Sequence, residues 1–306
     1  MTLMDLNSVA RPVLAGLLVR VPAVALAVGL SPLAAFATTD PSAALPRAAV
    51  RAAAGERLAA NGESLTRSSE GLVRAAEELV AELAPERNVY GSHPTEVVWA
   101  DPAAGIPARN RSVCSSFFSH LLERVYGVTR ERLAELTGKR NPHARDYYEA
   151  IVAQRGFIRI PTVGAIRPGD VIALSYPPGS GATGHVMLVD APPTLREATA
   201  PLLAGTRQFA VVVIDSSHSV HGLADTRGTP AQHGTGVGRG TFRLYVDSAG
   251  TIVASAWSIL RGSRLDDVRV RKLAVGRVDL AAASAQPPLA RSDDEGGSDD
   301  APSRER

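Results

Sequence analysis

The stretch GDVIALSYPPGSGATGHVMLVD, residues 169–190, decides the fold of this chain of 306 residues. It holds two short apolar runs, 170–174 and 185–189, on either side of a segment rich in Pro and Gly. Apolar runs of this length that are bounded by turn residues are typical of β-strands. The stretch therefore predicts two neighbouring strands, with His185 at the start of the second.

The segments on either side of this stretch differ in their periodicity. Before it, apolar residues recur at helical spacing in three segments: 113–125, 128–136 and 144–154. Close to it and after it, short β-type runs separated by Pro and Gly lie at 157–160, 209–214, 241–246 and 252–257. Helices followed by strands predict an α+β fold in which helices pack on a central antiparallel sheet.

Charge and composition exclude some classes of partner. The chain has 33 basic and 31 acidic residues, a formal net charge of +2, and no Lys/Arg-rich stripe with interleaved aromatic residues. Nucleic acid is therefore not an expected partner. Hydrophobic residues make up 45% of the chain, which is enough for a globular core.

The first 37 residues have the pattern of an export signal. Arg11 and Arg20 precede an apolar run that ends in the small-x-small triplet at 35–37. We expect residues 1–37 to be a signal peptide and the protein to be secreted or periplasmic, in a bacterium. The alternative is an uncleaved segment that associates with a membrane.

Three regions follow the signal. Residues 38–86 are rich in Ala, Arg, Glu and Leu and predict a helical extension. Residues 87–280 contain all the strand-like runs and form the main domain. Residues 281–306 are polar and highly charged, which predicts a disordered tail.

Cys114 is the single cysteine of the chain, so it has no partner for an intramolecular disulfide. It stands where a loop gives way to the helical segment, and Asn110 or Ser112 can cap that helix. A helix N-terminus favours the thiolate form of cysteine, because unpaired backbone N–H groups there carry positive partial charge. The position thus favours a nucleophile, although a free cysteine is also often a small buried core residue.

A nucleophilic thiol needs a base and a group that orients the base. His185 begins an otherwise apolar strand and is the candidate base. The run that ends at Ile214 continues into Asp215-Ser-Ser-His218, so a polar side chain can reach His185 from a neighbouring strand. Asp215 is the first candidate for the orienting group and His218 the second, while Asp215 can also simply start a turn.

Histidines in the Gly-rich segment 216–240 raise the question of a metal. His218, His221 and His233 lie near Asp215 and Asp225, but their spacing matches no zinc-site pattern. We therefore expect no metal and no cofactor.

Together these residues resemble the NlpC/P60 group of papain-like cysteine peptidases, to which the CHAP amidases are related. The resemblance rests on the order of four motifs: Val-Cys-Ser-Ser at 113–116, Pro-Gly-Asp-Val at 168–171, Gly-His-Val at 184–186 and Ile-Asp-Ser at 214–216. It covers about residues 88–258. The family usually has Asp and Gly where Val113 and Ser116 stand, and commonly His where Asp215 stands.

The resemblance implies that residues 87–280 are a catalytic domain with a papain-like fold. It implies Cys114 as nucleophile, His185 as base and Asp215 as third residue, with Ser115, Tyr90 and His218 in substrate binding. The implied reaction is cleavage of an amide bond, with peptidoglycan stem peptides as the expected substrate. Two alternatives stay open: amidase or acyltransferase chemistry on another substrate, and a catalytically inactive cell-wall-binding protein with the same fold.

Overall fold

The computed structural model describes residues 69–228 and 234–280. The predicted signal peptide, the first part of the helical extension (38–68) and the predicted tail lie outside these residues. Among the described helices, none combines the length and the apolar character needed to cross a bilayer.

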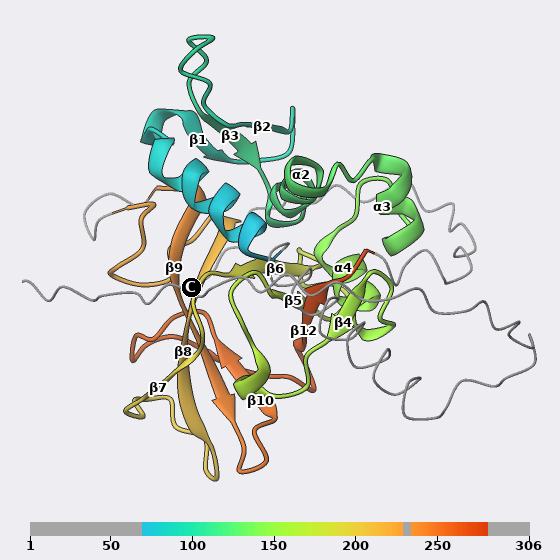
Figure 1. Cartoon of the computed structure of the whole chain (residues 1–306). Coiled ribbons are helices and arrows are strands. Elements are labelled where there is room, and N and C mark those ends of the chain that lie inside the picture. The colour runs from blue at the N-terminus through green and yellow to red at the C-terminus, as the bar shows by residue number, and fades with distance from the viewer. Residues whose placement is uncertain (1–68, 229–233, 281–306) are drawn as a thin grey trace, which may run out of the picture. The chain divides into compact units, whose positions relative to one another are not determined.

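The described chain is an α+β structure built on a nine-stranded sheet, as the sequence predicts (Figure 1). The strand order is β11-β10-β9-β8-β6-β5-β12-β4, and β7 pairs with β8 beside this path. Every pairing recorded in this sheet is antiparallel. The strands are β4 (Phe157–Arg159), β5 (Val171–Ser175), β6 (Gly184–Val189), β7 (Thr194–Arg196), β8 (Arg207–Ser217), β9 (Gly236–Val246), β10 (Ile252–Ala256), β11 (Leu265–Asp267) and β12 (Lys272–Val278).

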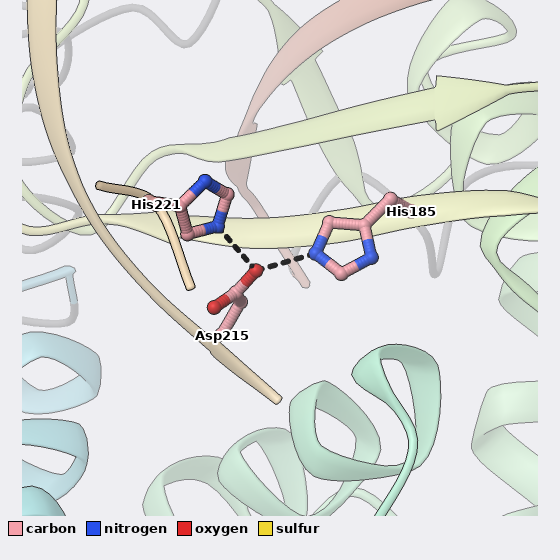
Figure 2. Close-up of side chains that lie close together, drawn as sticks. All are labelled: His185, Asp215 and His221. Atoms are coloured by element: carbon pink, nitrogen blue, oxygen red, sulfur yellow. Dashed lines mark hydrogen bonds and ion pairs between the residues drawn. The ribbon is translucent and has the colours of Figure 1, made fainter. Parts of the chain in front are cut away.

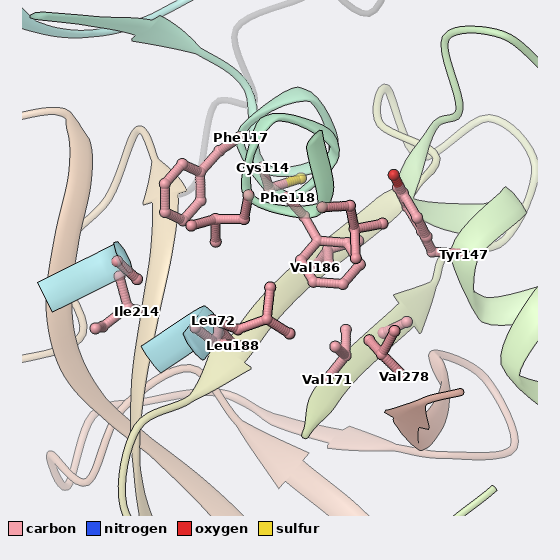
Figure 3. Packing of buried hydrophobic residues seen from close by; sticks show 14 of the residues in the cluster. Leu72, Cys114, Phe117, Phe118, Tyr147, Val171, Val186, Leu188, Ile214 and Val278 are labelled. Carbon is pink, nitrogen blue, oxygen red and sulfur yellow. The ribbon is translucent and has the colours of Figure 1, made fainter. Parts of the chain in front are cut away.

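Helices pack on this sheet around a large apolar core. They are α2 (Cys114–Tyr126), α3 (Arg130–Thr137), α4 (Ala144–Val152) and a helix over residues 69–82, which belongs to the predicted helical extension. Phe117 and Phe118 of α2 lie in one buried cluster with Val186 and Leu188 of β6 (Figure 3). Leu72 from the extension helix is in the same cluster, so this part of the extension is a core element of the domain.

Alternation along the strands supplies a second core. In β6, Val186 and Leu188 belong to the cluster under the helices, whereas Met187 and Val189 belong to another buried cluster. Successive side chains of a strand point to opposite faces of the sheet. The sheet is therefore buried on both faces, which explains why its strands appear in the sequence as nearly continuous apolar runs.

A small second sheet precedes α2, where the sequence suggested only a loop. Its strands are β1 (Asn88–Tyr90), β2 (Glu96–Val98) and β3 (Arg109–Ser112), in the order β1-β3-β2, and the short 3-10 helix η1 (Pro85–Arg87) leads into it. The sequence of β3, Arg-Asn-Arg-Ser, has no apolar alternation and gives no strand signal. A second 3-10 helix, η2 (Val163–Ala165), connects β4 to β5.

The register of the central strands sets the place of the candidate site. The recorded pairs between β6 and β8 are Leu188↔Ile214 and Val189↔Val213. In the described chain this pairing ends before His185 on one strand and before Asp215 on the other. The two polar residues therefore lie where β6 and β8 stop pairing, next to the start of α2.

Candidate active site

Cys114 is the first residue of α2, and its thiol is buried, with 6% of the residue exposed. Ser116 supports the start of this helix, because its Oγ accepts a hydrogen bond from the Val113 N–H at 3.0 Å. The expected cap by Asn110 or Ser112 is wrong: both residues belong to β3, and the Ser112 hydroxyl donates to Asn110 Oδ1. Only Val113 separates strand from helix, so it takes the cap position.

His185 is the second residue of β6 and is also 6% exposed. Gly184 before it has a φ of +156°, and a Cβ there would overlap the carbonyl oxygen of Leu174 on β5. A glycine is thus required for the strand to enter the sheet beside β5 with His185 in this position. Cys114 lies close enough to His185 to raise the pKa of its ring through charge and hydrogen bonding.

Asp215 of β8 is fully buried and accepts the other hydrogen bond of the His185 ring. His185 Nε2 donates to Asp215 Oδ2 over 2.5 Å. Because Nε2 is taken by the carboxylate, Nδ1 is left for the thiol of Cys114. The structure thus joins the three residues expected from the sequence as nucleophile, base and orienting group into one chain of hydrogen bonds, Cys114–His185–Asp215.

Charges around these residues shift two pKa values strongly. Burial by itself lowers the pKa of His185, but the charge of Cys114 and the hydrogen bonds with Asp215 and Cys114 raise it to about 10. Burial by itself raises the pKa of Asp215, but the charges of Arg227 and His221 and the hydrogen bonds from His185 and His221 hold it well below its usual range. Because of these shifts, His185 is an imidazolium at neutral pH and contacts the Asp215 carboxylate.

His221 is a second histidine on the same carboxylate oxygen, which Figure 2 shows between the two rings. His221 Nε2 donates to Asp215 Oδ2 over 2.8 Å, and His221 Nδ1 lies 2.6 Å from the carbonyl oxygen of Trp257. The Trp257 ring stacks on His221 at 4.1 Å between centroids and meets the His185 ring edge-on at 4.9 Å. The Trp257 ring therefore covers both histidines.

Arg227 completes the surroundings of Asp215 on the other oxygen. Arg227 Nη1 donates to Asp215 Oδ1 over 2.7 Å, and its Nε and Nη2 donate to the two oxygens of Asp225. The side chains of Arg227 and Asp225 in this pair are fully buried. Asp225 also accepts a hydrogen bond from the backbone N–H of His221, which fixes the loop that carries both groups.

The residues expected in substrate binding are Tyr90, His218 and Ser115. They lie close to the start of α2, either in the sequence or through contacts with the small sheet. Tyr90 pairs with Ser112 in the small sheet, and its ring stacks on that of His218 at 5.8 Å between centroids. His218 is exposed and belongs to this stack rather than to the hydrogen-bond chain, so Asp215, and not His218, accepts the hydrogen bond of His185. Ser115 is buried in the first turn of α2, where its carbonyl oxygen accepts a hydrogen bond from Ser119.

One group of potential metal ligands lies within the described residues. His185, Asp215 and His221 offer ligand atoms within 4.8 Å of one another. Two ligands at the usual bond length in a tetrahedral zinc site lie about 3.3 Å apart, whereas the N–O distances here are 2.5 and 2.8 Å. The spacing is that of hydrogen bonds between the side chains. His233, the remaining member of the histidine group considered from the sequence, lies outside the described residues.

Comparison with known proteins gives one relative. No family model matches the chain, and no solved structure matches it. The chain is 35% identical over 176 residues to "Uncharacterized protein R653" of Acanthamoeba polyphaga mimivirus, across 55% of this chain and 77% of the viral protein. The chain belongs to the family of this mimivirus protein. The name of the viral member states no activity, so the chemistry of the family has to be inferred from residues.

Three residues of the site, His221, Arg227 and Asp225, are not among the catalytic or substrate-binding residues expected from the sequence. They lie in a Gly-rich segment without periodicity. The signal that points to them is in β9, where glycines recur at every second position: Gly236, Gly238 and Gly240. A Cβ at Gly238 would overlap Arg227, and one at Gly240 would overlap Asp225 and His221. Glycines on one face of a strand can therefore indicate buried polar side chains beside it.

Proposed function

We propose that this protein is a cysteine hydrolase with a papain-like NlpC/P60 fold, which cleaves an amide bond. The observation that carries the proposal is the buried chain Cys114–His185–Asp215, with the thiol at a helix N-terminus. These features activate a thiol: the helix end and the imidazolium both stabilise the thiolate. The orienting carboxylate fixes the ring of His185, as nucleophilic catalysis requires.

The proposed reaction has two half-steps. The Cys114 thiolate attacks the carbonyl carbon of the amide, and the C–N bond breaks as His185 gives its proton to the leaving amine. Neutral His185 then takes a proton from a water molecule, whose oxygen attacks the thioester carbon, and the thiolate is released. The backbone N–H of Cys114 is the first in α2 and has no intrahelical acceptor, so it is the natural donor to the oxyanion.

Peptidoglycan stem peptides are the substrate class that the NlpC/P60 resemblance favours, with the protein acting in a secreted or periplasmic location. The Tyr90–His218 stack supports a substrate-binding role for this pair, because it lies beside β3, directly before the nucleophile. An aromatic ring next to an exposed imidazole offers a flat contact surface and a hydrogen-bonding group. For Ser115, a role in substrate binding is proposed only because this residue directly follows Cys114 in the sequence.

Alkylation of the single cysteine tests the proposal. At about pH 6 a free thiol is almost fully protonated, whereas a thiolate held by His185 stays reactive. We expect iodoacetamide to label Cys114 about tenfold to a hundredfold faster than a free cysteine. His185→Ala should remove most of this difference. His120→Ala is the matched control, because His120 lies on α2 and pairs with Glu123 instead.

The substrate class is tested next, with purified muropeptides and a panel of unrelated amides and thioesters. Fast labelling with cleavage of muropeptides supports the full proposal. Fast labelling with intact muropeptides favours amidase or acyl-transfer chemistry on another substrate. If Cys114 labels no faster than free cysteine and every substrate stays intact, the hydrolase proposal fails and an inactive binding protein is favoured.

A further inference from the structure

The carboxylate that orients His185 has an unusual number of cationic partners. Asp215 Oδ2 accepts from both His185 and His221, and Asp215 Oδ1 accepts from Arg227. The side chains of Asp215, His221 and Arg227 are fully buried, so water does not screen their charges. One anion is therefore in direct contact with three potential cations.

The hydrogen-bond partners of His221 define its charge. Its Nε2 faces the Asp215 carboxylate, and its Nδ1 faces the carbonyl oxygen of Trp257. An ionised carboxylate and a carbonyl oxygen can only accept, so both ring nitrogens donate. Only the doubly protonated ring has two N–H donors. His221 is thus an imidazolium in this arrangement, and Trp257 stacks on its face.

We propose that His221 and Arg227 are positioning residues that offset the charge of Asp215, so that Asp215 orients His185 without binding its proton too tightly. The inference rests on the proposed function, in which His185 must release its proton to the leaving group and recover it from water. A buried carboxylate with His185 as its only partner would hold that proton strongly. With two further cations on the carboxylate, its orienting hydrogen bond stays and its pull on the proton weakens.

The charged groups in contact with His185 come from α2 and β8. Cys114, a thiolate in the proposed function, is on one side, and Asp215 is on the other. His221 acts across Asp215, with 6.4 Å between the centroids of the two imidazole rings. Replacing Cys114 by Ala therefore leaves a His185 whose proton affinity is set by Asp215, His221 and Arg227.

The test is the NMR titration of His185 in Cys114→Ala, with and without His221→Gln. Loss of the His221 charge should move the midpoint of His185 upward by roughly one to two pH units, as expected for unit charges at this distance in a medium of intermediate polarity. If His221 were only a packing or hydrogen-bonding residue, its loss would loosen Asp215, and the midpoint would stay or move downward. An unchanged or lower midpoint overturns the proposal.

If His221→Gln does not fold, a second variant allows the same titration. The double change Asp225→Asn and Arg227→Gln removes one charge of each sign, and should also move the midpoint upward, by less, because Asp225 opposes Arg227. His120→Gln in the same background is the control and should leave His185 unchanged. Fast alkylation of the unmodified protein together with an unmoved midpoint would reject this inference alone, whereas slow alkylation would reject the hydrolase proposal.

Discussion

Asp170 and Asp215 are two aspartates of the same domain with no exposed surface, and their pKa values shift in opposite directions. Asp170 precedes β5, and its two oxygens accept from a single cation, Arg277, and from a backbone N–H. Burial dominates there and raises the pKa of Asp170, despite the opposing contacts. At Asp215 the partners outweigh burial. For these two buried carboxylates, the number of charged partners therefore decides the direction in which the pKa shifts.

The largest expected effect is a difference in the free energy of unfolding between the two variants that neutralise these aspartates. Asp215→Asn leaves Arg227 and His221 without their shared anion, and removing one partner from a buried ion pair costs about 3–5 kcal/mol in the free energy of unfolding. Asp170→Asn should cost less, about 1–2 kcal/mol, because the charged form of Asp170 is already disfavoured and Arg277 is partly exposed. Urea unfolding at neutral pH gives both values.

The same two substitutions distinguish a carboxylate that acts on Cys114 from one that has only a structural role. Asp215→Asn should slow alkylation of Cys114 by roughly tenfold, since a His185 without its anion stabilises the thiolate less. Asp170→Asn should leave the rate unchanged. Equal effects of the two substitutions, on stability and on alkylation, would remove the distinction on which this comparison rests.

A smaller effect is expected in the pH dependence of stability. The pKa of Asp215 is depressed, so its contribution is present above about pH 3.9 and is lost as the pH falls through the folded value. The pKa of Asp170 is raised, so acidification through the folded value relieves its unfavourable charge. His185 has a folded pKa of about 10, so its contribution is complete below about pH 6.5 and disappears as the pH rises through about 10.

At alkaline pH the contribution of His185 to stability can be measured by itself. Above about pH 8.5 a free thiol is ionised in the unfolded chain as well, so Cys114 no longer adds to the pH dependence. Between about pH 9 and pH 10 the protein should lose on the order of 1 kcal/mol of unfolding free energy. His185→Gln should show a flatter profile. Parallel profiles of the two proteins would show that His185 is not held as an imidazolium.

Local patterns were enough for six strands of the large sheet, β4, β5, β6, β8, β9 and β10, whereas β7, β11 and β12 were not predicted. His185 begins an apolar run and Asp215 follows one, and a polar residue at such a place stands out in the sequence. Cys114 stands out as the single cysteine of the chain, at the start of a helical segment. The small sheet before α2 was missed because the polar strand Arg109–Ser112 is held by pairing and not by an apolar face. The pairing of β12 between β5 and β4 joins segments far apart in the chain, which no local pattern records.

The partners of Asp215 were missed for a related reason. His221 and Arg227 follow β8 in a segment without periodicity, and their burial depends on space left by glycines of β9. Their role is a property of the folded arrangement, since each meets Asp215 only when the loop after β8 closes on that strand. In the sequence, this arrangement is marked only by the glycines at every second position from 236 to 240, at the start of β9.

The most direct measurement of the central claim is the ultraviolet absorbance of a thiolate at neutral pH. The chain has one cysteine, so the whole signal comes from Cys114. A thiolate held by His185 predicts absorbance at neutral pH that is lost on acidification, and that is absent at neutral pH from His185→Ala and from Cys114→Ala. A Cys114 that shows no thiolate at neutral pH, and ionises only in the alkaline range of a free thiol, would contradict the account.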